Sequence, residues 1–173
     1  MGAELGATTS IFPTDKRTKE YLQQQGRVED YVEIKADEDA VYDQELTVDL
    51  SALVPMTAKP HSPDAVVPVK ELEGMKINQV VIGSCTNSSF ADMMKAAKIL
   101  KGRKVAEHVS LVIAPGSSSI LAMLAKNGAL GDMVQAGARI LECGCGPCIG
   151  MGQAPLSKGI SLRTCLLYTS RCV

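Results

Sequence analysis

Two cysteine-bearing stretches decide the fold: GSCTN at residues 83–87 and GCGPCIG at residues 144–150. A short apolar run precedes each stretch, residues 79–82 in the first case and 138–141 in the second, and such runs are typical of buried strands. If these two strands are parallel neighbours, both loops leave the sheet at its carboxyl edge, where open α/β sheets place their ligands. The sequence therefore predicts that the cysteines of the two loops converge.

The three loop cysteines, Cys85, Cys145 and Cys148, allow several interpretations. One is a zinc site with water as the fourth ligand, since catalytic zinc keeps an open position. The Pro147-Cys148 pair is similar to part of the P-C-x-x-C motif of zinc deaminases. Those enzymes also need a His-x-Glu, however, and neither His61 nor His108 lies in one. A redox CxxC would leave Cys85 unexplained, and buried cysteines are also common as small core residues. The fourth interpretation is an iron–sulfur cluster with one open iron, because the glycine-rich loops let backbone approach a bulky cluster.

Three motifs resemble the aconitase superfamily: GSCTNSS at 83–89, ECGCGPCIGMGQAP at 142–155 and GAELGATTSIFP at 2–13. The resemblance implies a 4Fe-4S cluster held by Cys85, Cys145 and Cys148, with Cys143 as a neighbour. It also implies that Glu4 lies at the cluster and the substrate as a catalytic residue. Asn87 is expected to bond loop backbone or to orient the surroundings of the cluster.

The function that this resemblance implies is hydro-lyase chemistry, in which the open iron acts as a Lewis acid and a protein base removes a proton. We expect aconitate hydratase of the tricarboxylic acid cycle, which interconverts citrate and isocitrate through cis-aconitate. The alternatives are a 3-isopropylmalate or homoaconitate dehydratase large subunit and, from another class, a non-catalytic zinc-binding module. The family's base and substrate-binding arginines lie in segments that this chain lacks. Its partners would therefore be a hydroxy-acid substrate and missing parts of the enzyme or a small swivelling-domain subunit, without which we expect it to be inactive.

The resemblance also suggests how the chain is divided. Residues 1–70 correspond to the end of one aconitase-like α/β domain with a linker, and residues 71–164 to an incomplete cluster-binding domain. The matching segments of the family lie inside longer chains, so we expect a fragment. Residues 165–173 depart from the family, and we interpret them as a non-native tail.

Composition narrows the class of protein. The 173 residues are 46% hydrophobic and 21% charged with a net charge of −1, which suits a folded chain and gives no basic surface for nucleic acid. No apolar run reaches the roughly 20 residues that a membrane span needs. The six cysteines come without a secretory signal pattern, which favours a reducing cytoplasm over disulfides.

The repeated order of strand, loop and helix predicts an α/β fold with a mainly parallel sheet. The resemblance implies that the fold has three layers, α/β/α, and is aconitase-like but incomplete. Besides the two strands above, strands are expected at residues 45–50 and 109–114, and the proline-rich residues 53–69 are expected to be a connecting segment. Helices are expected at residues 16–25, from Ser89 to about residue 100, at 118–126 and at 132–136.

Overall fold

The structure is a computed structural model, and it describes residues 6–60, 62 and 64–164. The chain divides into two compact units between Leu53 and Val54. The domain ranges given above stay a prediction, as does the nature of residues 165–173, which lie outside the described residues. No helix in the described ranges is both long and apolar enough to cross a bilayer.

In the first unit, helix α1 spans Lys16–Gln24, as expected. It begins at Asp15, whose carboxylate accepts a hydrogen bond from the Thr18 N–H at 2.8 Å, while Thr18 reaches back to the Asp15 N–H. This reciprocal arrangement is a capping box, and it satisfies backbone donors that the first helical turn leaves without partners. Gly26 follows with a φ of +68°, as is usual after a helix end.

The strand expected at residues 45–50 is wrong. The segment has no regular structure before a short 3-10 turn at Leu50–Ala52. The side chains that were to face a core, Leu46 and Val48, are 82% and 54% exposed. Alternating polarity only creates a face that suits a sheet, and within the described residues no strand pairs with this segment to complete one.

The second unit begins with a hairpin that the sequence analysis missed. Strands β1 (Met56–Ala58) and β2 (Val66–Pro68) pair antiparallel, with Met56 opposite Pro68, and a 3-10 turn at Val69–Leu72 follows. Three residues are too few for an alternating pattern to be recognised. Two prolines in the intervening loop and one in β2 made the segment look like a plain connection.

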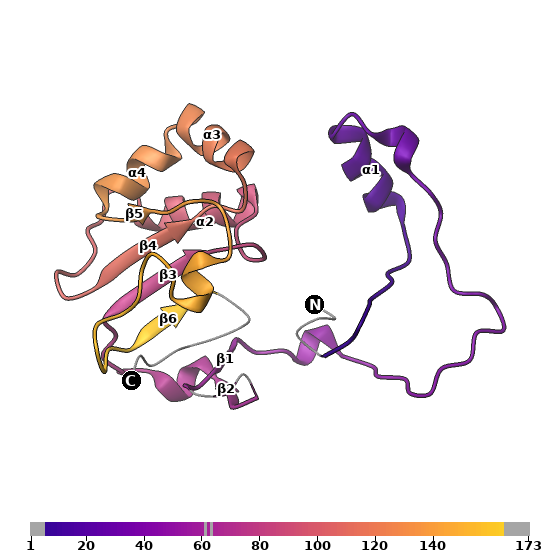
Figure 1. The fold of residues 1–173 in the computed structure, drawn as a ribbon, viewed down its shortest axis with the longest axis horizontal. Coiled ribbons are helices and arrows are strands. Elements are labelled where there is room, and N and C mark those ends of the chain that lie inside the picture. The colour runs from indigo at the N-terminus through magenta and orange to yellow at the C-terminus, as the bar shows by residue number, and fades with distance from the viewer. Residues whose placement is uncertain (1–5, 61, 63, 165–173) are drawn as a thin grey trace. The chain divides into compact units, whose positions relative to one another are not determined.

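The main sheet is parallel, as predicted. In the described residues it has four strands in the order β5-β4-β3-β6: β3 (Gln79–Gly83), β4 (Ser110–Ala114), β5 (Arg139–Ile140) and β6 (Ser161–Arg163) (Figure 1). The strands that precede the two cysteine loops, β3 and β5, are not neighbours, because β4 pairs with both of them. The expected common edge is still formed, since all the pairings are parallel.

Three helices accompany this sheet, and their bounds are close to those expected. They are α2 (Phe90–Leu100), α3 (Ser118–Lys126) and α4 (Ala129–Gln135). Ser89 caps α2 by accepting a hydrogen bond from the Asp92 N–H at 3.2 Å. Helix α4 begins three residues earlier than predicted, because Gly128 turns the chain with a φ of +83° and serves as its N-cap.

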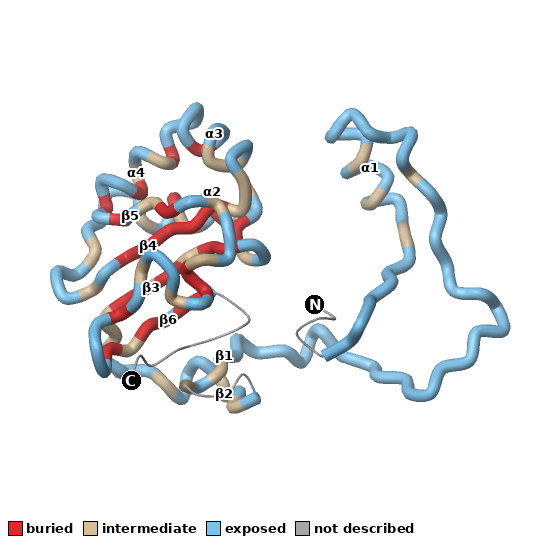
Figure 2. The backbone as a smooth tube through the Cα atoms, viewed as in Figure 1, coloured by how far each residue is buried: buried red, intermediate tan, exposed pale blue. Residues whose placement is uncertain are grey.

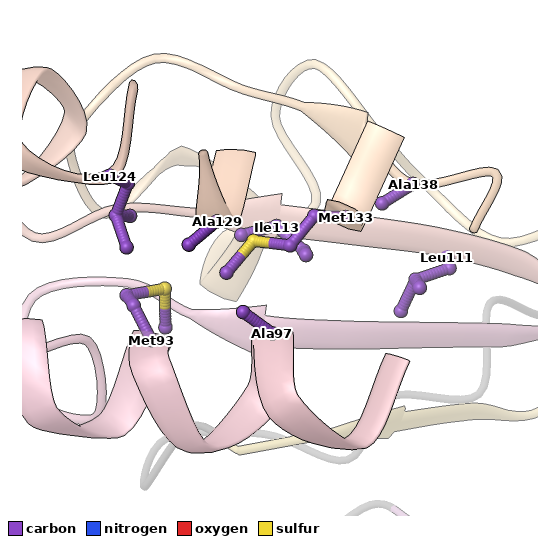
Figure 3. Packing of buried hydrophobic residues seen from close by; sticks show 8 residues of the cluster. All are labelled: Met93, Ala97, Leu111, Ile113, Leu124, Ala129, Met133 and Ala138. Atoms are coloured by element: carbon purple, nitrogen blue, oxygen red, sulfur yellow. The ribbon is translucent and has the colours of Figure 1, made fainter. Parts of the chain in front are cut away.

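Buried residues lie along β3, β4 and β6 and in α2 (Figure 2), and the apolar ones form two clusters. On one face of the sheet, side chains from α2, α3 and α4 pack with residues of β4 (Figure 3), and this cluster comprises Met93, Ala97, Leu111, Ile113, Leu124, Ala129, Met133 and Ala138. On the other face lie Val81, Val112, Ala114 and Leu141. Residues of β3 and β4 thus alternate between two cores, as expected of a strand covered on both sides.

Candidate metal centre

The first cysteine loop starts with a sharp turn at the end of β3. Gly83 has a φ of +116°, and an added Cβ would lie only 2.0 Å from the Ala114 carbonyl oxygen, so no other residue fits. The Ser84 N–H donates to the same oxygen at 2.9 Å. These contacts tie the loop to the end of β4 and leave Cys85 exposed.

The loop after β4 packs against the first cysteine loop. A Cβ at Gly116 would lie 2.6 Å from the Ser88 hydroxyl, which itself donates to the Ser84 carbonyl. Ser117 then caps α3 by accepting from the Ile120 N–H at 3.3 Å. The carboxyl ends of β3 and β4 therefore form one packed rim.

The second cysteine loop contains a short 3-10 turn at Gly146–Ile149, for which Cys145 is the N-cap. The Cys148 N–H donates to the Cys145 carbonyl at 3.1 Å, and the Met151 N–H donates to Gly146 at 2.8 Å. Gly150 ends the turn with a φ of +81°. The turn leaves the Cys145 side chain exposed and buries Cys148, which is 2% exposed.

The structure brings the two loops together at Cys85 and Cys145. A hydrogen bond with the Thr86 hydroxyl, at 3.5 Å, and a second one with the Cys145 thiol lower the pKa of the Cys85 thiol. Hydrogen bonds to a thiolate stabilise its charged form, which is the form that binds metals. One cysteine from each loop therefore lies near the other, while the predicted set of three ligands stays a prediction.

The predicted meeting of all three sulfurs is not reproduced. Within the described ranges, no three His, Cys, Asp or Glu side chains form a group that could hold a metal ion. Cys148 is covered by protein, and Cys143 lies half-buried before the turn. The residues nevertheless fit an iron–sulfur cluster in their donor chemistry, since the turn carries two thiols and Cys145 meets Cys85. Open space also lies beside the turn at Gly144 and Gly150, where an added Cβ would meet no atom within 4 Å.

The remaining predicted residues divide into two groups. The Asn87 side-chain amide donates to the Thr164 carbonyl, directly after β6, and not to the backbone of its own loop. Glu4 and His61 lie outside the described residues. The ligand role of the three cysteines and the catalytic role of Glu4 stay predictions.

The sequence analysis missed Arg163, which is 6% exposed and donates to the backbone of the CxxC turn. In the sequence, an arginine two residues after Ser161 was a weak signal. Its role became clear only from the pairing of β6 with β3. Its neighbour Thr164, which contacts the Cys85 loop, was missed as well.

Comparison with known proteins gives a consistent result. The model of the aconitase family (aconitate hydratase) matches residues 1–75 and 69–171. The chain is 45% identical over 159 residues to 3-isopropylmalate dehydratase large subunit 2 of Archaeoglobus fulgidus, covering 92% of this chain and 38% of that protein. It is 42% identical over 160 residues to the 3-isopropylmalate dehydratase large subunit of Moorella thermoacetica, with the same coverage. It is 37% identical over 179 residues to the methanogen homoaconitase large subunit of Methanocaldococcus jannaschii, covering 99% of this chain and 42% of that protein.

The chain thus spans about two fifths of the length of these relatives. The family model accounts for nearly all of its residues, and the sequence motifs that resembled the superfamily lie inside the matched ranges. The chain therefore belongs to the aconitase family.

Proposed function

We propose that this chain is the cluster-carrying part of the large subunit of a hydro-lyase of the 3-isopropylmalate dehydratase type. The observation that carries the proposal is the contact between Cys85 and Cys145, which joins two thiols from separate loops at the carboxyl side of one parallel sheet. The names and identities of the relatives give it the substrate class, a hydroxy acid with more than one carboxylate.

This assignment replaces the expectation of aconitate hydratase. The sequence analysis favoured aconitate hydratase, but the relatives described above are named for 3-isopropylmalate and for homoaconitate chemistry. Identity over nine tenths of the chain weighs more than individual motifs, so the place in the tricarboxylic acid cycle is dropped. Homoaconitase stays a second candidate, because a relative of that name aligns with 99% of the chain.

In this proposal Cys85, Cys145 and Cys148 hold a 4Fe-4S cluster as thiolates. Three cysteines leave one iron open, and when bound the cluster supplies a Lewis acid for the substrate hydroxyl. The Thr86 hydroxyl bonds to the Cys85 sulfur and lowers the pKa of this thiol, which favours the ligating form. Cys148 lies in the same turn as Cys145, whose carbonyl accepts from the Cys148 N–H, and it is the proposed third ligand. Glu4 is proposed to touch the substrate, and Asn87 to hold the Cys85 loop.

The chain would work together with further protein. The relatives are named as large subunits, which implies a second subunit, and they are more than twice as long as this chain. We therefore propose that the 173 residues bind the cluster but do not turn over substrate alone. A reducing cytoplasm is the compartment we propose, because cysteines must stay reduced to serve as thiolate ligands.

Anaerobic reconstitution of the chain with ferrous iron and sulfide tests the proposal. We expect broad visible absorption and about four irons per chain, the stoichiometry of the proposed cluster. A chain that stays colourless and takes up zinc with equal stoichiometry would overturn it in favour of a zinc module. Adding 3-isopropylmalate, homoaconitate or citrate to the reconstituted chain and recording the electron paramagnetic resonance spectrum then compares the candidate substrates, and we expect 3-isopropylmalate to perturb the spectrum most.

A further inference from the structure

We propose that Arg163 and Thr164, at the end of β6, clamp the two cysteine loops against each other and are positioning residues for the cluster. The inference rests on the proposed function, because positioning matters only if the loops carry a common ligand. Neither residue would be a ligand. Each acts on the backbone that presents the cysteines.

Arg163 holds the CxxC turn. Its Nη1 donates to the Pro147 carbonyl at 2.6 Å and to the Cys148 carbonyl at 3.0 Å. Arg163 is buried, at 6% exposed, and hydrogen bonds from an ionised donor are stronger than neutral ones. One planar group thus fixes two successive carbonyls of the turn, including that of a proposed ligand.

The guanidinium is itself held in place by polar side chains on the same face of the sheet. Its Nε donates to the Ser161 hydroxyl at 3.0 Å, and Ser161 donates to the Gln79 amide oxygen at 2.7 Å. Gln79 is buried and reaches the Gln153 carbonyl at 3.5 Å, beyond the turn. The network therefore connects β3 and β6 to the CxxC turn through Arg163, and to Gln153 beyond the turn through Gln79.

Thr164 holds the Cys85 loop. Its hydroxyl accepts from the Gly83 N–H at 2.9 Å, and its carbonyl accepts from the Asn87 amide. Its own N–H donates to the Val81 carbonyl at 3.0 Å, which continues the pairing of β6 with β3. The residues two positions before and two positions after Cys85 are therefore both bonded to one threonine.

The two anchors are adjacent along the chain, so a single peptide unit sets the spacing of the two loops. Protein groups that orient metal ligands without binding the metal usually change affinity by 10-fold to 100-fold when removed. This arrangement also explains why Cys85 and Cys145 lie within hydrogen-bonding reach of each other although they follow strands that are not neighbours.

The test uses the 173-residue chain with the substitutions Thr164→Val and Arg163→Lys. Valine keeps the shape of threonine but removes the acceptor for Gly83, and Thr164→Ser is the matched control that keeps it. Lysine keeps the charge but cannot reproduce the planar fork that serves the turn and Ser161 together. Far-ultraviolet circular dichroism and a cooperative thermal transition establish that each variant folds.

Two readouts follow, one of which needs no iron. In the reconstituted chains, we measure the rate of cluster loss to a chelator and the electron paramagnetic resonance spectrum. In the iron-free chains, diamide removes two electrons and two protons from a thiol pair, and peptide mapping gives the yield of the Cys85–Cys145 disulfide. We expect Thr164→Val and Arg163→Lys to lose the cluster about 10-fold faster, with an altered spectrum. We also expect them to form less of this disulfide, while Thr164→Ser stays close to the wild type in both assays.

The outcomes separate the two proposals. A wild-type chain that binds no cluster overturns the proposed function, whatever the disulfide assay gives. A wild-type cluster that the Thr164→Val and Arg163→Lys variants retain with unchanged rate, spectrum and disulfide yield overturns the clamp alone. Loss of cluster stability in those two variants, with Thr164→Ser unaffected, supports it.

Discussion

The Cys145 side chain lies near the Cys85 thiol and helps to lower its pKa, although one cysteine follows β3 and the other follows β5. Strand β4 lies between these strands, so the loops must bend over its end to meet. The bend is possible because Gly83 lets the first loop turn against the Ala114 carbonyl. This relationship underlies the predictions that follow.

Replacing the proposed ligands one at a time should remove the cluster. Cys85→Ser, Cys145→Ser and Cys148→Ser each leave two of the three thiolates, and we expect each to lower iron and sulfide uptake by at least about 10-fold. Cys143→Ser is the matched control and should bind as the wild type does. Equal loss in Cys143→Ser and Cys148→Ser, measured by visible absorption, would mean that the ligand set has been wrongly assigned.

The lowered pKa of Cys85 predicts a pH dependence. The thiolate is the nucleophile, so the rate at which iodoacetamide alkylates Cys85 should rise with pH. Because the pKa of Cys85 is lowered, this rise should occur at lower pH than for an ordinary cysteine, whose pKa is roughly 8.5. Thr86→Val removes the largest cause of the shift, so the rise should move to higher pH. Mass spectrometry of the peptide that contains Cys85 measures this, and Thr86→Ser, which keeps the hydroxyl, is the control. An unchanged profile in Thr86→Val would contradict the assigned cause.

Gly83→Ala should prevent the first loop from forming. The added Cβ would overlap the Ala114 carbonyl at 2.0 Å, and the backbone φ of +116° is strained for alanine. We expect a loss of several kcal/mol in the free energy of unfolding, or no folded protein. Gly131→Ala is the control, since it lies in α4 with no atom within 4 Å of the new Cβ and should be neutral or stabilising by up to about 1 kcal/mol. Similar melting of the two variants would refute the close approach.

Met93→Ala should destabilise the core between α2 and the sheet. Met93 is 0% exposed and lies in the cluster with Ile113 and Met133, so truncation leaves a cavity. Substitutions of this kind cost about 2–5 kcal/mol. Met123→Ala removes the same atoms from a side chain that is 42% exposed, and we expect a smaller change. Denaturant unfolding followed by circular dichroism compares the two, and equal costs would count against Met93 as a core residue.

Local signals in the sequence predicted helices of both units well where they were strong. The caps at Asp15 and Ser89 and the apolar spacing of α2 placed helix starts correctly, because capping depends on residues a few positions apart. The same reasoning failed at residues 45–50, at the hairpin β1–β2 and at β6. In each case pairing with another segment decides whether a strand exists, and three-residue strands carry too little pattern to reveal it.

By itself, the sequence determined the chemistry that is available: thiols in two glycine-rich loops after strands, in motifs that belong to the aconitase family. Only the tertiary structure decided which thiols meet and which of them is buried. It also decided that Arg163 bonds to the CxxC turn and Thr164 to the Cys85 loop. The physical reason is that residue types and short spacings specify local conformation, whereas contacts between distant segments depend on strand order and side-chain packing. Strand order here places β4 and β6 on either side of β3, and no pattern within the separate motifs encodes that.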